Sequence, residues 1–141
     1  MVTAFKSLTR KSSICIAFLF LLLFPISFQA QEKTKDTLFF KIDNSYIFEN
    51  ENIPKMFFIQ DSNTSEEFCF AETTVFKNLR PMKVLDLKYF IRNSRFYINE
   101  GSLKLANQEL MDFLKHYKIF LVRENEGVTE CIAVDITLRA Y

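Results

Sequence analysis

Glycine and histidine are scarce in this sequence of 141 residues, which contains two glycines, one histidine and no tryptophan. Phosphate-binding loops, dinucleotide fingerprints and the nucleophile elbow of hydrolases all require glycines at fixed spacings. Gly101 and Gly127 lie too far apart to build any of these motifs. We therefore expect no cofactor and no enzyme of these motif-defined classes.

The residues that most often perform acid–base catalysis or bind transition metals are equally few. His116 is the one histidine, and only Cys69 and Cys131 remain beyond the N-terminal region. Their spacing does not fit a zinc site, and no aspartate-rich calcium loop is present. His116 suits a solvent-facing position near a helix C-terminus. We expect no catalytic residue and no metal ligand, and hence a protein that is not an enzyme.

Neither sign of charge dominates the chain, which has 18 basic and 17 acidic residues. Residues 1–30 hold three of the basic residues and none of the acidic ones, so the remainder has 15 basic against 17 acidic, a formal charge of −2. Neutralising the phosphates of a nucleic acid requires a basic block or stripe, which this remainder does not contain. We expect no binding to nucleic acid.

The N-terminal region has the three parts of a cleavable signal peptide. Lys6, Arg10 and Lys11 precede an apolar run over residues 14–26, and Ala30 suits the position before the cleavage point. The run is shorter than the roughly 20 apolar residues that span a bilayer, and an uncleaved anchor is the alternative.

This organisation divides the chain into three segments. Residues 1–30 are the predicted signal peptide, residues 31–37 form a polar lead-in, and residues 38–141 form a single domain with no room for a second core. No membrane span is expected after cleavage. The mature protein is then exported, to the periplasm, to the cell surface or into the medium.

Aromatic and apolar runs separated by turn residues predict an antiparallel sheet built of hairpins. Three hairpins are predicted: residues 38–42 with 46–48, residues 56–60 with 67–72, and residues 118–123 with 128–138. The tip of the second hairpin contains Asn63-Thr64-Ser65, which matches the N-glycosylation sequon.

Helical spacing appears between the second and third hairpins. Leu87, Phe90 and Ile91 follow Asp86, a suitable N-cap, and a longer amphipathic helix is predicted over residues 105–117. Strands come first, then helices, then strands again. The fold class we expect is therefore α+β, an antiparallel sheet of hairpins with two helices packed on one face.

Two groups of side chains are candidates for a functional role. Cys69 and Cys131 either pair in a disulfide or are two small buried side chains that never meet. Phe-Phe pairs place one ring on each face of a strand, so helices on one face alone would leave aromatic rings exposed for a partner. The candidates for this exposed aromatic surface are Phe39, Tyr46, Phe48 and Phe57. The alternative is that a bent sheet or loops cover the second face.

The export signal ends Phe28-Gln29-Ala30-Gln31, the composition is rich in Phe, Lys, Asn and Ile, and aromatic runs occur at residues 36–43 and 117–122. In these features the chain resembles small exported proteins of unknown function from Bacteroidota. The resemblance implies a periplasmic or surface location, and it carries no active site over to this sequence.

The function we expect is that of an exported, non-enzymatic domain that binds a protein or another cell-envelope component through its sheet. The near-neutral charge and the surplus of aromatic residues favour this function. One alternative is a small extracytoplasmic hydrolase, which would need several titratable groups in a pocket. The other is a component of a secretion or surface assembly, which would need an open edge strand.

We expect the protein from its native cells to have lost residues 1–30, because signal peptidase cuts after a small residue such as Ala30. Intact-mass spectrometry and cell fractionation check this, with a new N-terminus expected within a few residues of Gln31. A cytosolic product that still carries Met1 through Ala30 would contradict both export and the expected compartment.

Overall fold

The computed structural model describes residues 35–141, and the predicted signal peptide and most of the polar lead-in lie outside the described residues. Strands make up 52% of the described residues and helices 13%. No helix in this part of the chain is both long enough and apolar enough to cross a membrane. The described domain is mostly β structure.

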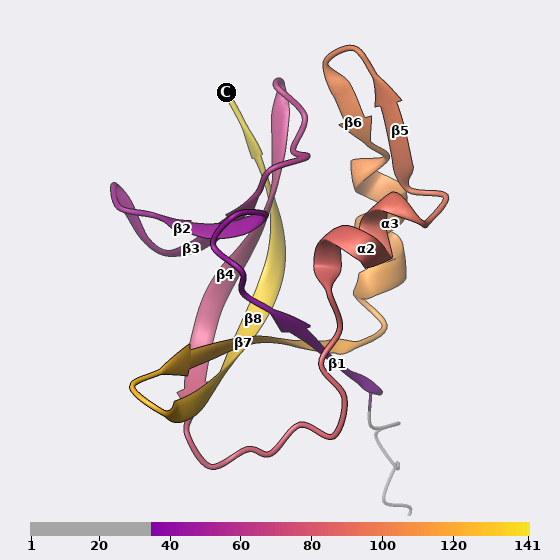
Figure 1. Ribbon diagram of the computed structural model, residues 1–141. Helices are drawn as coiled ribbons and strands as arrows, with labels where there is room; N and C mark the ends of the chain where they lie inside the picture. The colour runs from indigo at the N-terminus through magenta and orange to yellow at the C-terminus, as the bar shows by residue number, and fades with distance from the viewer. Residues whose placement is uncertain (1–34) are drawn as a thin grey trace, which may run out of the picture. The chain divides into compact units, whose positions relative to one another are not determined.

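Six strands form one curled, mixed sheet in the order β1-β7-β8-β4-β3-β2 (Figure 1). The strands are β1 (Thr37–Lys41), β2 (Ile47–Asn50), β3 (Ile53–Ile59), β4 (Glu66–Phe76), β7 (Lys118–Asn125) and β8 (Val128–Ala140). Neighbouring strands are antiparallel except β1 and β7, which run parallel. The longest strands, β4 and β8, pair with each other at the centre of the sheet.

The connection from β4 to β7 contains two short helices and a second sheet of two strands. In chain order these elements are α2 (Leu87–Arg92), β5 (Tyr97–Glu100), β6 (Leu103–Leu105) and α3 (Asn107–Leu114). Asp86 caps α2 as predicted, because its carboxylate accepts a hydrogen bond of 2.8 Å from the Tyr89 N–H. In Figure 1 the four elements form one group beside the curled sheet.

The predicted fold class, α+β with an antiparallel sheet of hairpins and helices on one face, is wrong. Residues 38–42 and 46–48 do not form a hairpin, since β1 pairs in parallel with β7 and β2 pairs with β3. The carboxylate of Asp43 accepts hydrogen bonds from the N–H groups of Ser45, Tyr46 and Ile47. These bonds hold a turn that directs the chain away from β1.

The other two predicted hairpins are confirmed as β3–β4 and β7–β8. The second predicted helix is shorter than expected, since α3 spans Asn107–Leu114 rather than residues 105–117. Residues 103–105 belong to β6 instead. Leu105, the first residue of the predicted helix, is held extended by hydrogen bonds between its backbone and the Asn63 side chain at the β3–β4 tip.

The core lies inside the curl of the sheet. Strand residues that point to this inner face, such as Phe40, Phe70 and Leu121, are fully buried. The two helices supply only four of the 17 buried side chains in the core cluster: Leu87, Ile91, Leu110 and Leu114. The sheet therefore encloses the core largely by its own curvature, and the expected layer of helices over one face is not needed.

The curl also brings β2 and β7 together across the interior, although three strands separate them in the sheet. Arg123 of β7 lies 3.7 Å from the carboxylate of Glu49 in β2 and 2.9 Å from that of Glu130 in β8. Lys77, just after β4, lies 3.8 Å from Glu130. Side chains alternate along β7, so Arg123 lies on the same inner face as the buried Leu121. The charged side chains around Arg123 therefore lie at the end of the apolar core.

Asn63, at the tip of the β3–β4 hairpin, fastens this hairpin to β6. Its side-chain oxygen accepts hydrogen bonds from the N–H groups of Lys104 and Leu105 at 2.7 and 2.8 Å, and its amide donates to the Leu105 carbonyl at 2.9 Å. Asn63 is 5% exposed. The asparagine of the predicted sequon is therefore inaccessible for glycosylation in the folded domain.

We expect Asn63→Ala to lower the free energy of unfolding by about 3 kcal/mol, because three hydrogen bonds are lost and the β6 backbone groups stay buried without partners. Urea unfolding measures the change. Thr64→Ala, at the exposed neighbouring position, is the matched control. A loss below about 1 kcal/mol for Asn63→Ala would show that other contacts hold β6 in place.

Candidate functional site

Three phenylalanines form what we call the outer aromatic cluster, on the face of the sheet turned away from the core: Phe39 of β1, Phe76 of β4 and Phe120 of β7. Phe39 and Phe120 lie opposite each other in the parallel register, with ring centroids 5.1 Å apart and ring planes at 19°. Phe76 approaches Phe120 at 5.9 Å in a T-shaped arrangement. Phe76 is 41% exposed, and the other two rings are partly buried.

The cluster arises because β1 and β7 each carry apolar residues at consecutive positions. Phe40 and Leu121 point into the core, which turns Phe39 and Phe120 to the outer face. Smaller residues occupy the same face of the sheet beside the rings: Val122 and Cys131, which are buried, and Ala133, which is partly buried.

A pocket of about 310 Å³ borders this cluster. Its lining includes Lys41 and Val122, which lie two positions beyond Phe39 and Phe120 on the same strands and the same face. Val84 also lines the pocket and is 41% exposed. It precedes Leu85, which forms a parallel bridge with Phe40 along the outer edge of β1.

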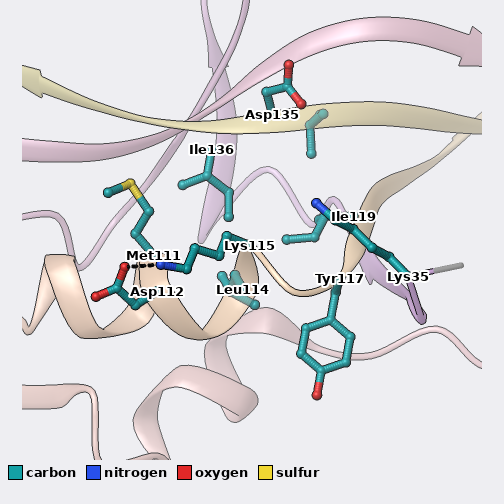
Figure 2. A pocket seen from close by; sticks show the side chains of 10 residues that line it. Lys35, Met111, Asp112, Leu114, Lys115, Tyr117, Ile119, Asp135 and Ile136 are labelled. Carbon is teal, nitrogen blue, oxygen red and sulfur yellow. Dashed lines mark hydrogen bonds and ion pairs between the residues drawn. The ribbon is translucent and has the colours of Figure 1, made fainter. Parts of the chain in front are cut away.

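A larger groove of about 520 Å³ lies between α3 and β8 (Figure 2). Its floor is apolar and includes Leu114, Ile119, Val134 and Ile136. Four exposed charged residues stand around it: Lys35, Asp112, Lys115 and Asp135. Asp112 and Lys115 form an ion pair at 2.8 Å.

One partly buried polar cluster joins the β3–β4 tip to α2. Arg92 donates two hydrogen bonds, of 3.0 and 3.2 Å, to Asp61, which is 5% exposed. Burial by itself raises the pKa of Asp61, but the hydrogen bonds and charge of Arg92, together with the neighbouring Tyr46 hydroxyl and the charge of Lys104, outweigh burial and hold that pKa below its ordinary value. Since the buried charge of Asp61 is neutralised by the partly exposed Arg92, we assign this pair a structural role.

Tyr46 lies beside this pair and is 1% exposed. Its hydroxyl has no partner in hydrogen-bond geometry among residues 35–141. Burial and the neighbouring Asp61 carboxylate both raise the pKa of Tyr46, so the phenol stays protonated at physiological pH.

The four aromatic residues predicted to share one exposed surface are distributed over the fold. Tyr46 and Phe57 are each 1% exposed and belong to the core, so the prediction is wrong for both. Phe39 is in the outer aromatic cluster. Phe48 of β2 is 38% exposed and stacks on Phe58 with ring centroids 6.2 Å apart, at the other end of the sheet order.

Cys69 and Cys131 are free, fully buried thiols. Cys69 lies opposite Thr137, six residues beyond Cys131 along β8, which puts the two cysteines about 20 Å apart at the rise of a strand. A disulfide would require about 6 Å between their Cα atoms. Burial raises the pKa of Cys69 to about 11 and also raises that of Cys131, so neither is an activated nucleophile.

His116 is exposed after the end of α3, in a shallow pocket that it shares with Arg95, Glu109 and Asp112. Neither cysteine lines that pocket, so the fold does not assemble a Cys–His pair there. Across residues 35–141, no group of three or more His, Cys, Asp or Glu side chains is placed to hold a metal ion.

Sequence reasoning missed Phe76, Phe120 and Val84. Phe120 had a usable signal, because the burial of Ile119 and Leu121 on one face of a strand turns Phe120 to the other. The face of the sheet on which Phe76 lies is set by the irregular register between Glu72 and Thr74. The position of Val84 is set by the long-range bridge between its neighbour Leu85 and Phe40. Neither of these leaves a local pattern.

No family model, curated protein sequence or solved structure matches the chain. The features of the described domain that bear on function are the outer aromatic cluster, its bordering pocket and the groove between α3 and β8.

We expect Asp61 to stabilise the fold above about pH 4 and to lose this contribution as the pH falls, since its pKa is lower in the folded chain than in the unfolded one. Arg92→Met removes the donor that lowers this pKa, so acid unfolding should begin at a higher pH. Circular dichroism during acid titration measures the midpoint. Arg95→Met, an exposed arginine three residues on, is the control. Equal midpoints for the two variants would contradict this role.

Proposed function

We propose that the domain is a non-catalytic binding module for a protein partner and that it works outside the cytoplasm. The observation that carries this proposal is the outer aromatic cluster, in which apolar rings reach solvent on the face opposite the core. The compartment is proposed from the sequence of residues 1–30 and from the resemblance to exported Bacteroidota proteins.

The orientation of the rings favours a protein over a carbohydrate as the partner. Sugars stack on the open face of an aromatic ring, but Phe39 and Phe120 turn their faces toward each other, with ring planes at 19°. The ring plane of Phe76 makes an angle of 64° with that of Phe120, and Phe76 packs against this stacked pair. Ring edges backed by small apolar residues suit the apolar side chains of a protein, and aromatic residues are enriched in protein interfaces.

The bordering pocket offers a place for an anchoring side chain of that partner. Its volume of about 310 Å³ is at the lower limit for small-molecule sites and fits a single inserted side chain. Val84 and Val122 give it apolar lining, and Lys41 and Glu124 add charged groups to that lining. Protein interfaces likewise combine apolar and polar groups.

The edges of the sheet do not favour the alternative function, in which the domain would assemble with other proteins by adding a strand to its sheet. The outer edge of β1 already binds Leu85, through Leu85 N–H to Phe39 O at 2.8 Å and Lys41 N–H to Leu85 O at 3.0 Å. At the other edge, β2 has four residues and a register shift next to Asn50. Short, irregular edge strands resist the addition of another strand.

The groove between α3 and β8 gives little support to a hydrolase. A hydrolase would need a nucleophile and a base that converge on one reacting atom. In the groove, Asp112 is bound to Lys115, and Asp135 lies on the opposite side of β8 from α3 (Figure 2). These carboxylates are therefore separated by a strand and do not act on one substrate atom.

We expect a photo-reactive amino acid placed at Phe76 or Val84 to form protein adducts in native cells, because both positions are exposed within the proposed interface. The same group at Tyr89 of α2, which is 71% exposed, is the control outside the interface. Gel mobility and mass spectrometry identify the adducts. Phe76→Lys, which places a charge in the cluster, should abolish the adduct formed at position 84.

Three outcomes would overturn the proposal. Equal adduct yields at Tyr89 and at the cluster positions would show that contacts are unspecific. Adducts that survive complete proteolysis as a glycan would identify a carbohydrate partner. An adduct composed of two copies of this chain would identify self-association instead of a separate protein.

A further inference from the structure

The groove between α3 and β8 has an apolar floor that is continuous with the core of the domain. Leu114, Ile119 and Val134 are 0%, 4% and 7% exposed, and all three belong to the core cluster. Ile136 of β8 points from the strand toward α3, and Met111 of α3 stands at one end of the groove (Figure 2). The floor is therefore already shielded from water, and an apolar ligand would mainly cover the partly exposed side chains of Met111 and Ile136.

The charges around the groove are not equivalent. Asp112 is held by Lys115, whose hydrogen bond lowers the pKa of this carboxylate, so the pair carries no net charge. Asp135 projects from the other side of β8 because its neighbours on the strand face the groove. Lys35 extends over Ile119 toward β8 and makes no ion pair with any residue of the described range 35–141.

We propose that this groove binds a free, single-chain amphiphile with an anionic head group, of the long-chain carboxylate class. The apolar floor accepts the hydrocarbon chain, and the ammonium group of Lys35 accepts the head group through a charge-assisted hydrogen bond. A volume of about 520 Å³ lies within the range of small-molecule sites. The site is distinct from the outer aromatic cluster and goes beyond the protein binding proposed above.

The charge distribution also fixes the direction of the ligand. A head group at the Lys35 end meets an ammonium that the described residues leave without a carboxylate partner. At the opposite end it would meet the Asp112–Lys115 pair, which carries no net charge and offers no unpaired cation to the head group. The chain of the ligand therefore runs from Lys35 over Ile119 and Ile136 toward Met111.

The test is a titration with sodium dodecanoate, kept below its micelle concentration, of the protein purified after expression of the full chain. Calorimetry gives the affinity, and methyl NMR shifts locate the ligand. We expect saturable binding with the largest shifts at Leu114, Ile119 and Ile136. Lys35→Glu should weaken binding about ten-fold or more, because it replaces an attraction with a repulsion. Lys88→Glu, at an exposed lysine of α2 outside the groove, should bind as the unmodified chain does.

Dodecanol, with the same chain and no charge, should bind about ten-fold more weakly than dodecanoate. Unchanged amide spectra confirm that each variant is folded. The proposal is overturned if no saturable binding occurs, if the shifts centre on Phe39, Phe76 and Phe120, or if Lys35→Glu and Lys88→Glu have equal affinity. Binding to anionic phospholipid vesicles without binding to free dodecanoate would also overturn it, because the ligand would then be a membrane surface.

Discussion

The six-stranded sheet carries apolar side chains on both faces, and its curl can enclose only one of them. The inner face closes on itself so completely that Glu49 of β2 reaches Arg123 of β7 across the interior. The outer face keeps Phe39 and Phe120 at its surface. Both sites follow from this constraint, since the aromatic cluster is on the face left outside and the groove lies where α3 meets the curled sheet.

The parallel pairing of β1 with β7 decides which aromatic side chains reach that outer surface. It sets Phe39 against Phe120 in register, whereas a hairpin between β1 and residues 46–48 would have set Phe39 beside β2. The same arrangement leaves the other edge of β1 free to bind Leu85, which brings Val84 to the bordering pocket. One non-local pairing thus assembles the cluster, and the pocket adjoins it as a consequence.

The sequence predicts those features whose determining contacts are local. The β3–β4 and β7–β8 hairpins and the cap at Asp86 were predictable because turn residues and caps act within a few positions. The partner of β1 lies far along the chain, and loop-closing pairings of that kind leave no periodic pattern. The Phe57-Phe58 pair illustrates the limit for the site, since either ring could point inward until the strand register is known.

A single strand supports both proposed sites, because its alternating side chains serve opposite faces. Val134 and Ile136 of β8 form part of the groove floor, while Cys131 and Ala133 lie under the outer aromatic cluster. A shift in the register of β8 would therefore disturb both sites together, because it would exchange the side chains of the two faces. Lys35 and Phe76 stand outside this strand and each belongs to one site alone, so a loss of binding at one of them reports on that site and leaves the other as an internal reference.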